Sequence, residues 1–97
     1  MTGNEYQQLA MRTCKDPILD HAIFGLASEA GEAAGIMQKT FQGHVFDKEH
    51  MSKELGDCLW MIAEACSALD LKLEDVMEQN IENFVKDIQM VLKLKKV

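Results

Sequence analysis

The chain has 97 residues, of which 47% are hydrophobic and one is proline, and its formal net charge is −6. This length fits one domain with a modest core, so a homo-oligomer is expected. The negative charge argues against a nucleic-acid polymer as partner, because such binding relies on clustered Lys and Arg. No apolar run approaches the roughly 20 residues that a membrane span requires.

The N-terminus lacks the charged-then-apolar pattern of a signal peptide. We therefore expect a soluble, cytoplasmic protein. Cys14, Cys58 and Cys66 show no C-x-x-C spacing, and two of them lie in apolar helical sequence. Reduced thiols are therefore expected rather than a disulfide or a zinc site.

The first two predicted helices are separated by a proline. The opening stretch TGNE has the pattern of a capping box and predicts a helix that ends at about Cys14. Asp16 is a good N-cap residue and Pro17 suits a first helical position, so a second helix is predicted over about residues 17–40.

The second half of the chain predicts two further helices and no strand. Asp47 is the expected N-cap of a third helix that ends at about Leu69, and a fourth helix is predicted from about Leu73. The predicted fold class is all-α, most simply an antiparallel four-helix bundle.

Two acidic pairs stand out, in the stretches LASEAGEAAG and KELGD. On a helical wheel, Glu29 and Glu32 lie roughly 70° and 130° to one side of the apolar stripe of their helix. Glu54 and Asp57 lie roughly 80° and 140° from the stripe of theirs, in the same rotational sense. A short loop favours antiparallel packing, which brings all four carboxylates to one side of the helix pair.

Four converging carboxylates repel one another unless a cation lies among them. Mg²⁺ suits such a site because it prefers oxygen ligands and is commonly completed by substrate phosphates. Gly31 and Gly56 lie inside the two acidic pairs and indicate close packing or close approach, since Gly in a helix costs roughly 1 kcal/mol against Ala. The alternative is that acids three residues apart simply occupy solvated helix faces.

The stretch SEAGE, followed about twenty residues later by KELGDCLWMIAEA, resembles the MazG-like nucleotide pyrophosphohydrolases of the all-α NTP pyrophosphatase superfamily, whose signature is E-x-x-E and then E-x-x-D. The likeness runs from NEYQQLAMRT to LEDVMEQNIE. It implies a single domain over residues 1–97 that hydrolyses an NTP or dNTP to the monophosphate and pyrophosphate, as in cleaning of the nucleotide pool. It also implies Mg²⁺, with Mn²⁺ as a substitute. The catalytic and metal-binding residues that it implies are Glu29, Glu32, Glu54 and Asp57, one glutamate being a candidate general base.

Three further residues are candidates for substrate binding. Asn80 matches a position of the family that faces the substrate, and it also falls on the apolar stripe of the fourth helix, where a structural hydrogen bond is the alternative. Lys39 and Lys53 are placed to reach phosphates, and the alternative is that both are solvated lysines.

Trp60 bears on assembly. It lies roughly 160° from the centre of the main apolar stripe of the third helix, which predicts a second buried face. That face is either a subunit interface or a contact with the first or fourth helix of the same chain. The family resemblance implies a homodimer or homotetramer with sites completed across subunits.

Residues 83–97 depart from the family pattern, in which NIE is followed by KLRKRYPDGF. A coding string for EKLRKRYPDGFEAEKS that loses one A from its first A-run reads ENFVKDIQMVLKLKKV, the segment that starts at Glu82. We hypothesise a frameshifted tail that places Asn83 where the family has a lysine. A gene sequence unrelated to this string after the Glu82 codon would refute it.

Two other functional classes compete with the enzyme. The altered tail favours a catalytically weakened helical oligomer that binds metal or nucleotide. A carboxylate-bridged di-iron bundle would require paired Glu-x-x-His motifs. Only the stretch DKEH remotely resembles one, and there Asp47 is interpreted as a cap and His50 as a surface residue.

Overall fold

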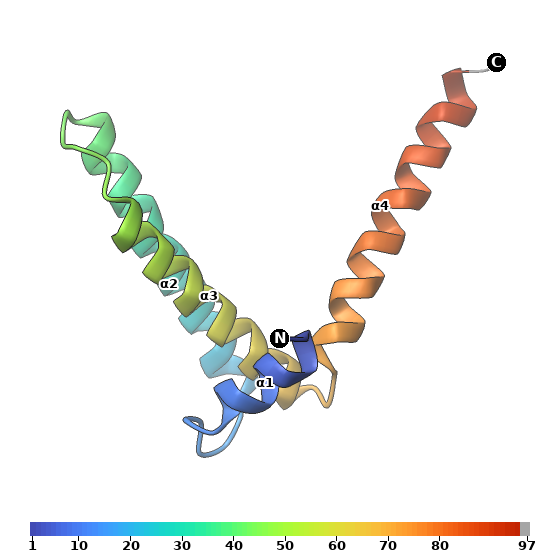
Figure 1. Ribbon diagram of the computed structural model, residues 1–97, viewed down its shortest axis with the longest axis horizontal. Helices are drawn as coiled ribbons and strands as arrows, with labels where there is room; N and C mark the ends of the chain where they lie inside the picture. The colour runs from blue at the N-terminus through green and yellow to red at the C-terminus, as the bar shows by residue number, and fades with distance from the viewer. Residues whose placement is uncertain (96–97) are drawn as a thin grey trace.

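The all-α prediction is confirmed by the computed structural model, which describes residues 1–95. No strand occurs within that range, and none of its helices is both long and apolar enough to cross a membrane. Residues 96 and 97, the end of the atypical tail, lie outside the described residues. The helices are α1 (Gly3–Met11), α2 (Leu19–Phe41), α3 (Lys48–Ala68) and α4 (Leu73–Lys95) (Figure 1).

Two of the helix starts follow the predicted capping chemistry. At α1, the Glu5 N–H donates to Thr2 Oγ1 at 3.0 Å and the Thr2 N–H donates to Glu5 Oε1 at 3.2 Å, which completes the capping box. At α3, the His50 N–H donates to Asp47 Oδ1 at 3.0 Å. Both helices therefore begin where a local side chain satisfies their free N–H groups.

The predicted start of α2 is wrong. The helix begins at Leu19, and Ile18 occupies the N-cap position without a side-chain cap of its own. A carboxylate from another helix supplies the missing acceptor, because Glu64 of α3 accepts the Ile18 N–H at 3.2 Å. This tertiary contact replaces the local cap expected from Asp16.

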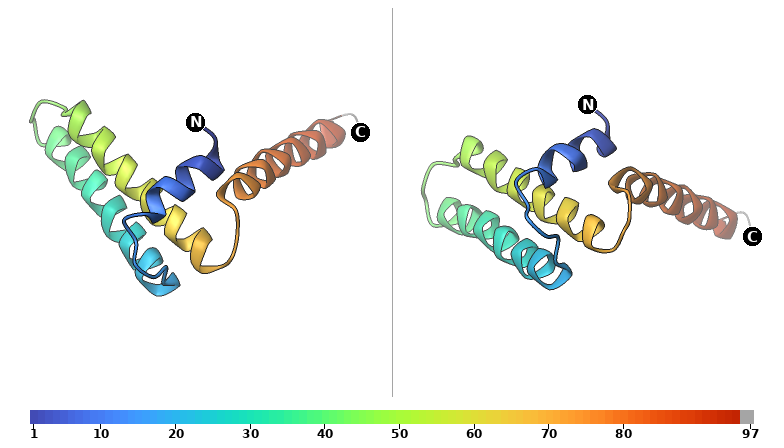
Figure 2. Two further views of the ribbon diagram at one scale, coloured as in Figure 1. Left: turned by 60° about the horizontal axis from the view of Figure 1, so that its bottom comes forward. Right: turned by 90° about the horizontal axis from the view of Figure 1, so that it is seen from below.

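Helices α2 and α3 form the main packed unit, an antiparallel pair joined by a short loop (Figures 1 and 2). They approach closely where a Cβ at Gly25 would lie 2.5 Å from Met61 Sδ. The expectation of close packing at Gly31 and Gly56 is wrong, since a Cβ at either position would meet no atom within 4 Å. Both glycines are open in the single subunit.

Helix α1 crosses α3 near the end distant from the α2/α3 loop (Figure 2). The Trp60 indole N–H donates to the Ala10 carbonyl and to Thr13 Oγ1, both at 3.1 Å. Of the two alternatives for Trp60, contact with the first helix of its own chain is the one observed. Gln7 of α1 connects this helix to α4, because its Oε1 accepts the N–H of Leu73, the first residue of α4, at 2.7 Å.

Helix α4 leaves this unit and projects away, so that it forms one arm of a V whose other arm is the α2/α3 pair (Figure 1). It contacts α1 and α3 but not α2. Every residue from Met77 to Lys95 is exposed. The four helices are therefore those of a bundle-like fold, but within the described residues α4 has no neighbour along most of its length.

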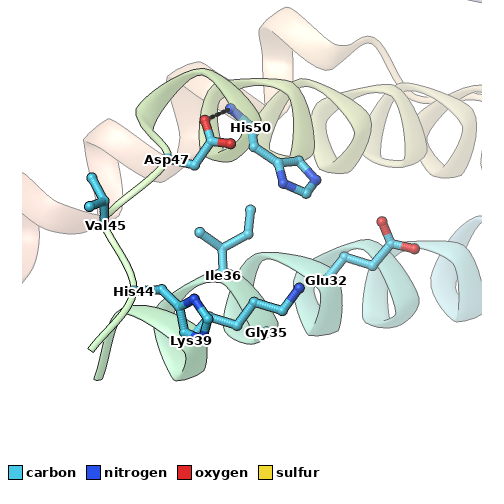
Figure 3. A pocket seen from close by; sticks show the side chains of 8 residues that line it. All are labelled: Glu32, Gly35, Ile36, Lys39, His44, Val45, Asp47 and His50. Carbon is cyan, nitrogen blue, oxygen red and sulfur yellow. Dashed lines mark hydrogen bonds between the residues drawn. The ribbon is translucent and has the colours of Figure 1, made fainter. Parts of the chain in front are cut away.

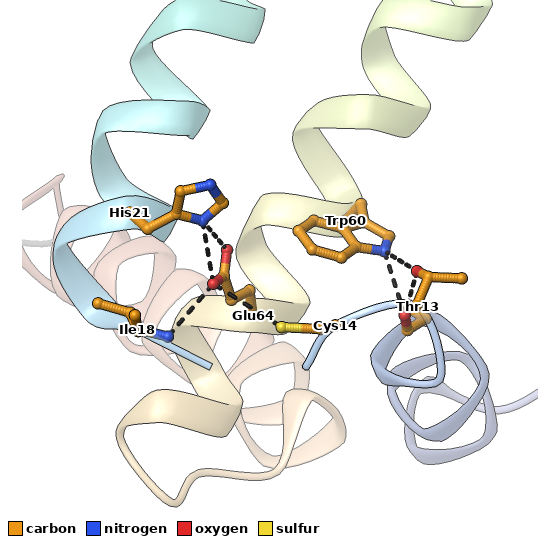
Figure 4. Close-up of polar contacts among 7 residues, drawn as sticks. Thr13, Cys14, Ile18, His21, Trp60 and Glu64 are labelled. Atoms are coloured by element: carbon orange, nitrogen blue, oxygen red, sulfur yellow. Dashed lines mark hydrogen bonds and ion pairs between the residues drawn. The ribbon is translucent and has the colours of Figure 1, made fainter. Parts of the chain in front are cut away.

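A buried carboxylate links α3 to the chain before α2 (Figure 4). Glu64 is 1% exposed and accepts hydrogen bonds from the Ile18 N–H and from His21 Nδ1, which lies 2.8 Å from Oε1. The Cys14 thiol donates to its Oε2 at 3.9 Å. Each oxygen of this carboxylate thus has a donor.

Replacement of Glu64 by Ala should lower the free energy of unfolding by about 2–3 kcal/mol, because it removes a buried, charged hydrogen-bond acceptor and leaves the Ile18 N–H without that acceptor. Urea unfolding measures this loss, and amide exchange at Ile18 should accelerate. Glu78→Ala, on the exposed part of α4, is the control. Equal stability of both variants would contradict the role of Glu64 as the cap of α2.

Candidate metal centre

Carboxylates from two helices meet on one side of the α2/α3 pair. One carboxylate oxygen from each of Glu29, Glu54 and Asp57 lies within 4.8 Å of the others. Glu32 lies next to this group, since hydrogen bonding to Glu54 and the charge of Asp57 both act on it. The equal rotational offsets found on the helical wheel therefore correspond to a convergence of Glu29, Glu54 and Asp57, with Glu32 beside them.

The cluster contains buried oxygens that lack hydrogen-bond donors. Glu54 is 2% exposed, and its Oε1 lies 3.1 Å from His50 Nε2. Its Oε2 and the Oε2 of Glu29 are buried without any partner. Because an unpaired buried carboxylate oxygen is costly, these atoms require a proton or a cation.

The pKa values of the cluster follow from this crowding. Hydrogen bonding to Glu54 is the largest cause that raises the pKa of Glu29 and of Glu32, and neighbouring negative charges raise both further. Burial opposes the ionisation of Glu54, but hydrogen bonds from Glu32, Glu29 and His50 together lower its pKa. Glu29 and Glu32 therefore retain protons more readily than isolated carboxyl groups do.

The donor set fits a hard divalent cation. One oxygen from each of Glu29, Glu54 and Asp57 lies within 4.8 Å of the others, so three donors from two helices already form one group. Its members offer only oxygen, which Mg²⁺ prefers. The buried Oε2 atoms of Glu29 and Glu54, which have no hydrogen-bond donor, would be bonded to such a cation when it is present.

A cavity of about 420 Å³ adjoins the carboxylates at the loop end of the α2/α3 pair (Figure 3). Glu32 and His50 belong to its wall and also contact Glu54, so the cavity and the cluster are continuous. The side chain of Lys39 extends along the cavity toward Glu32 (Figure 3). The remaining lining residues are Gly35, Ile36, His44, Val45 and Asp47.

The other two candidate substrate residues lie outside this arrangement. Lys53 is exposed on α3 and does not line the cavity. Asn80 is exposed on α4, the arm that does not contact α2. A single chain therefore brings Lys39 toward the carboxylates but leaves Asn80 apart from them.

Sequence reasoning missed two contributors to the cluster. His50 is 51% exposed at its side chain, as expected of a surface residue, yet its Nε2 lies 3.1 Å from Glu54 Oε1. The spacing of four residues between them on a helix was an available signal. Tyr6 of α1 also lies near, because burial and then the charge of Asp57 raise its pKa. No local pattern connects Tyr6 with α3, so only the packing of α1 places it there.

Residues 20–86 match the model of the MazG nucleotide pyrophosphohydrolase domain. The Gene 37 protein of Mycobacterium phage L5 is 32% identical over 68 residues, which cover 65% of this chain. The match spans 60% of the length of that relative. A search of the solved structures found no match.

Adding Mg²⁺ without nucleotide should raise the Tm at pH 7.5, with a smaller rise near pH 5, because there the ion must displace protons held by Glu29 and Glu32. In the metal-free chain these two groups stabilise the fold below the ordinary pKa of 4.5, and this contribution is lost as the pH rises through their raised pKa values. Glu54, with its lowered pKa, acts in the opposite sense.

Thermal unfolding of Glu54→Gln provides the comparison, since this variant should lose most of the response to Mg²⁺. Glu49→Gln, at an exposed acid in the first turn of the same helix, should retain it. An undiminished rise in Tm for Glu54→Gln would place the ion elsewhere.

Proposed function

Because the chain belongs to the MazG nucleotide pyrophosphohydrolase family, with the domain matched over residues 20–86, we propose that it is a divalent-metal-dependent enzyme that converts an NTP or dNTP and water to the monophosphate and pyrophosphate. The observation that carries the proposal is the convergence of Glu29, Glu54 and Asp57 with two buried oxygens that lack donors. Housecleaning of the nucleotide pool is the inferred role, and the cytoplasm, where that pool lies, is the inferred location.

In this proposal Glu29, Glu32, Glu54 and Asp57 hold Mg²⁺, and Mn²⁺ is a substitute. When bound, the ion supplies neutralisation of phosphate charge and orientation of a water molecule. The water oxygen forms a bond to the α-phosphorus, and the bond from that phosphorus to the bridging oxygen breaks, so that pyrophosphate leaves. A carboxylate must accept the proton of the water. Glu32 is the exposed member of the cluster, which favours it as this base.

The residues around the cluster are assigned by their position. Lys39 enters the cavity next to Glu32, which supports a contact with the phosphates of the substrate. His50 orients Glu54 through its hydrogen bond. Lys53 and Asn80 remain candidate substrate residues, and Asn80 requires another subunit to approach the carboxylates.

Pyrophosphate release from a panel of NTPs and dNTPs with Mg²⁺ tests the proposal. Glu54→Ala and Asp57→Ala should each lower the rate by about 100-fold or more, because each removes a metal ligand. Glu49→Ala, outside the cluster, should retain the parental rate. Full activity in both cluster variants would refute the assigned site.

A second candidate function is a catalytically weakened oligomer that binds metal or nucleotide. Its support is the tail, since the family match ends at residue 86 and Asn83 stands where the family resemblance places a lysine. Such a chain retains its carboxylates while its contacts with phosphate are reduced.

Replacement of residues 83–97 by the in-frame sequence KLRKRYPDGFEAEKS distinguishes the two candidates. If the chain is a catalytically weakened oligomer, the replacement should raise kcat/KM for pyrophosphate release by about tenfold or more, because contacts with phosphate are restored. Binding of Mg²⁺ without nucleotide should not change, because the carboxylates are untouched. A parental chain that is already as active as the restored one would exclude the catalytically weakened oligomer.

We also propose that the protein is a homo-oligomer, a dimer or a tetramer. Support comes from the large apolar side chains that one subunit leaves exposed on several helices. These include Phe24 of α2, Leu55 and Leu59 of α3, and Ile81, Phe84 and Ile88 of α4. Apolar surface on this scale is typical of proteins that bury it against a partner.

A further inference from the structure

Helix α4 carries a continuous apolar stripe. Met77, Ile81, Phe84, Ile88 and Val91 follow one another at alternating spacings of four and three residues. This spacing is that of a coiled-coil seam, and it keeps the five side chains on one face of the helix. A second row widens the stripe on one side and consists of Val85 and Leu92.

Only the first part of the stripe is covered within the subunit. Leu73 is buried, and Met77 lies against α1, where a Cβ at Gly3 would be 2.7 Å from Met77 Sδ. From Ile81 to Leu92 the side chains of the stripe are 47–63% exposed, and no described helix packs on them. This free stripe (Ile81, Phe84, Val85, Ile88, Val91 and Leu92) is about 18 Å long.

The charges of α4 are divided along its length. Residues 73–82 contain four carboxylates and no basic residue, whereas residues 83–95 contain three lysines and the single carboxylate of Asp87. The two ends of the free stripe therefore have opposite charge. Such a helix is complementary to a copy of itself that runs in the opposite direction, while a parallel copy would place like charges together.

We propose that the free stripe pairs with the free stripe of a second copy of this chain in an antiparallel helix pair. With a two-fold axis between them, Ile81 lies opposite Val91 of the partner subunit and Phe84 opposite Ile88 of the partner subunit. The acidic turn that contains Glu78 then lies beside Lys95 of the partner subunit. The inference rests on the homo-oligomer proposed above and assigns its contact surface and direction.

Part of the paired surface lies beyond the residues that match the family model. The match ends at residue 86, but the stripe continues with the same spacing to Val91 and Leu92. Because α4 points away from the α2/α3 pair (Figure 1), its free stripe lies on a different arm from the carboxylate cluster.

Sedimentation velocity over a range of concentrations tests the surface. The parent should show dimer or larger mass, and Phe84→Glu combined with Ile88→Glu should lose it, because the substitutions place charges in the seam. Met90→Glu is the matched control, since Met90 is 62% exposed and lies on the opposite face of the same helix. Circular dichroism checks that α4 remains helical in each variant.

Cysteine cross-linking tests the direction. Antiparallel pairing predicts intermolecular disulfides when Ile81→Cys and Val91→Cys are present in the same chain, and little cross-linking with either substitution alone. Parallel pairing would cross-link each single variant, because identical residues then face one another. The parent controls for its own cysteines.

The outcomes separate this inference from the proposals that precede it. A parent that is monomeric at all concentrations overturns both the pairing and the homo-oligomer. An oligomer that survives the glutamate substitutions overturns the pairing alone and moves the interface to another surface. Cross-linking of the single-cysteine variants overturns the antiparallel direction.

Discussion

The burial of a carboxylate among other carboxylates is the constraint on which the rest of this structure depends. Glu54 is almost fully buried and has Glu29, Glu32 and Asp57 as neighbours. Like charges at this separation oppose folding unless protons or cations compensate them. The chain itself provides only partial compensation through His50, and the raised pKa values of Glu29 and Glu32 provide more by retaining protons. A bound metal ion would compensate the negative charge of these carboxylates at neutral pH.

Helix α3 contains two buried glutamates ten residues apart, and their surroundings differ. Both oxygens of Glu64 are hydrogen-bonded, and the residue connects α3 to the start of α2. One oxygen of Glu54 is hydrogen-bonded and the other has no partner. A satisfied buried carboxylate contributes to stability, whereas an unsatisfied one indicates a position prepared for a ligand. Glu64 thus supports the helix pair that presents Glu54.

The open shape of the chain follows from its short length. Its most deeply buried apolar residues are largely small, among them Ala22 and Ala63, and many large apolar residues remain on the surface. A single copy therefore has a modest core and an arm, α4, with little to pack against. The same arm carries Asn80 and the described part of the atypical tail, and every residue from Met77 to Lys95 is exposed on it.

The sequence by itself determined that the chain is all-α and that its acidic pairs lie on one side of a helix pair. The period of the apolar residues and the caps at Thr2 and Asp47 predicted the helices, because both are local features of a helix. The offsets of Glu29, Glu32, Glu54 and Asp57 from their stripes predicted their convergence, because a short loop enforces antiparallel packing.

Only the tertiary structure decided the features that depend on contacts between distant segments. The cap of α2 comes from Glu64, 46 residues beyond Ile18, and no local pattern predicts such a contact. Trp60 donates to the Ala10 carbonyl at the end of α1, and Gly31 and Gly56 are open rather than closely packed within the chain. The direction of α4 likewise follows from the turn between α3 and α4 and from Gln7, whose Oε1 accepts the N–H of Leu73, the first residue of α4. Local sequence specifies the period of a helix and its local caps. The fold decides which groups from distant segments contact the helix.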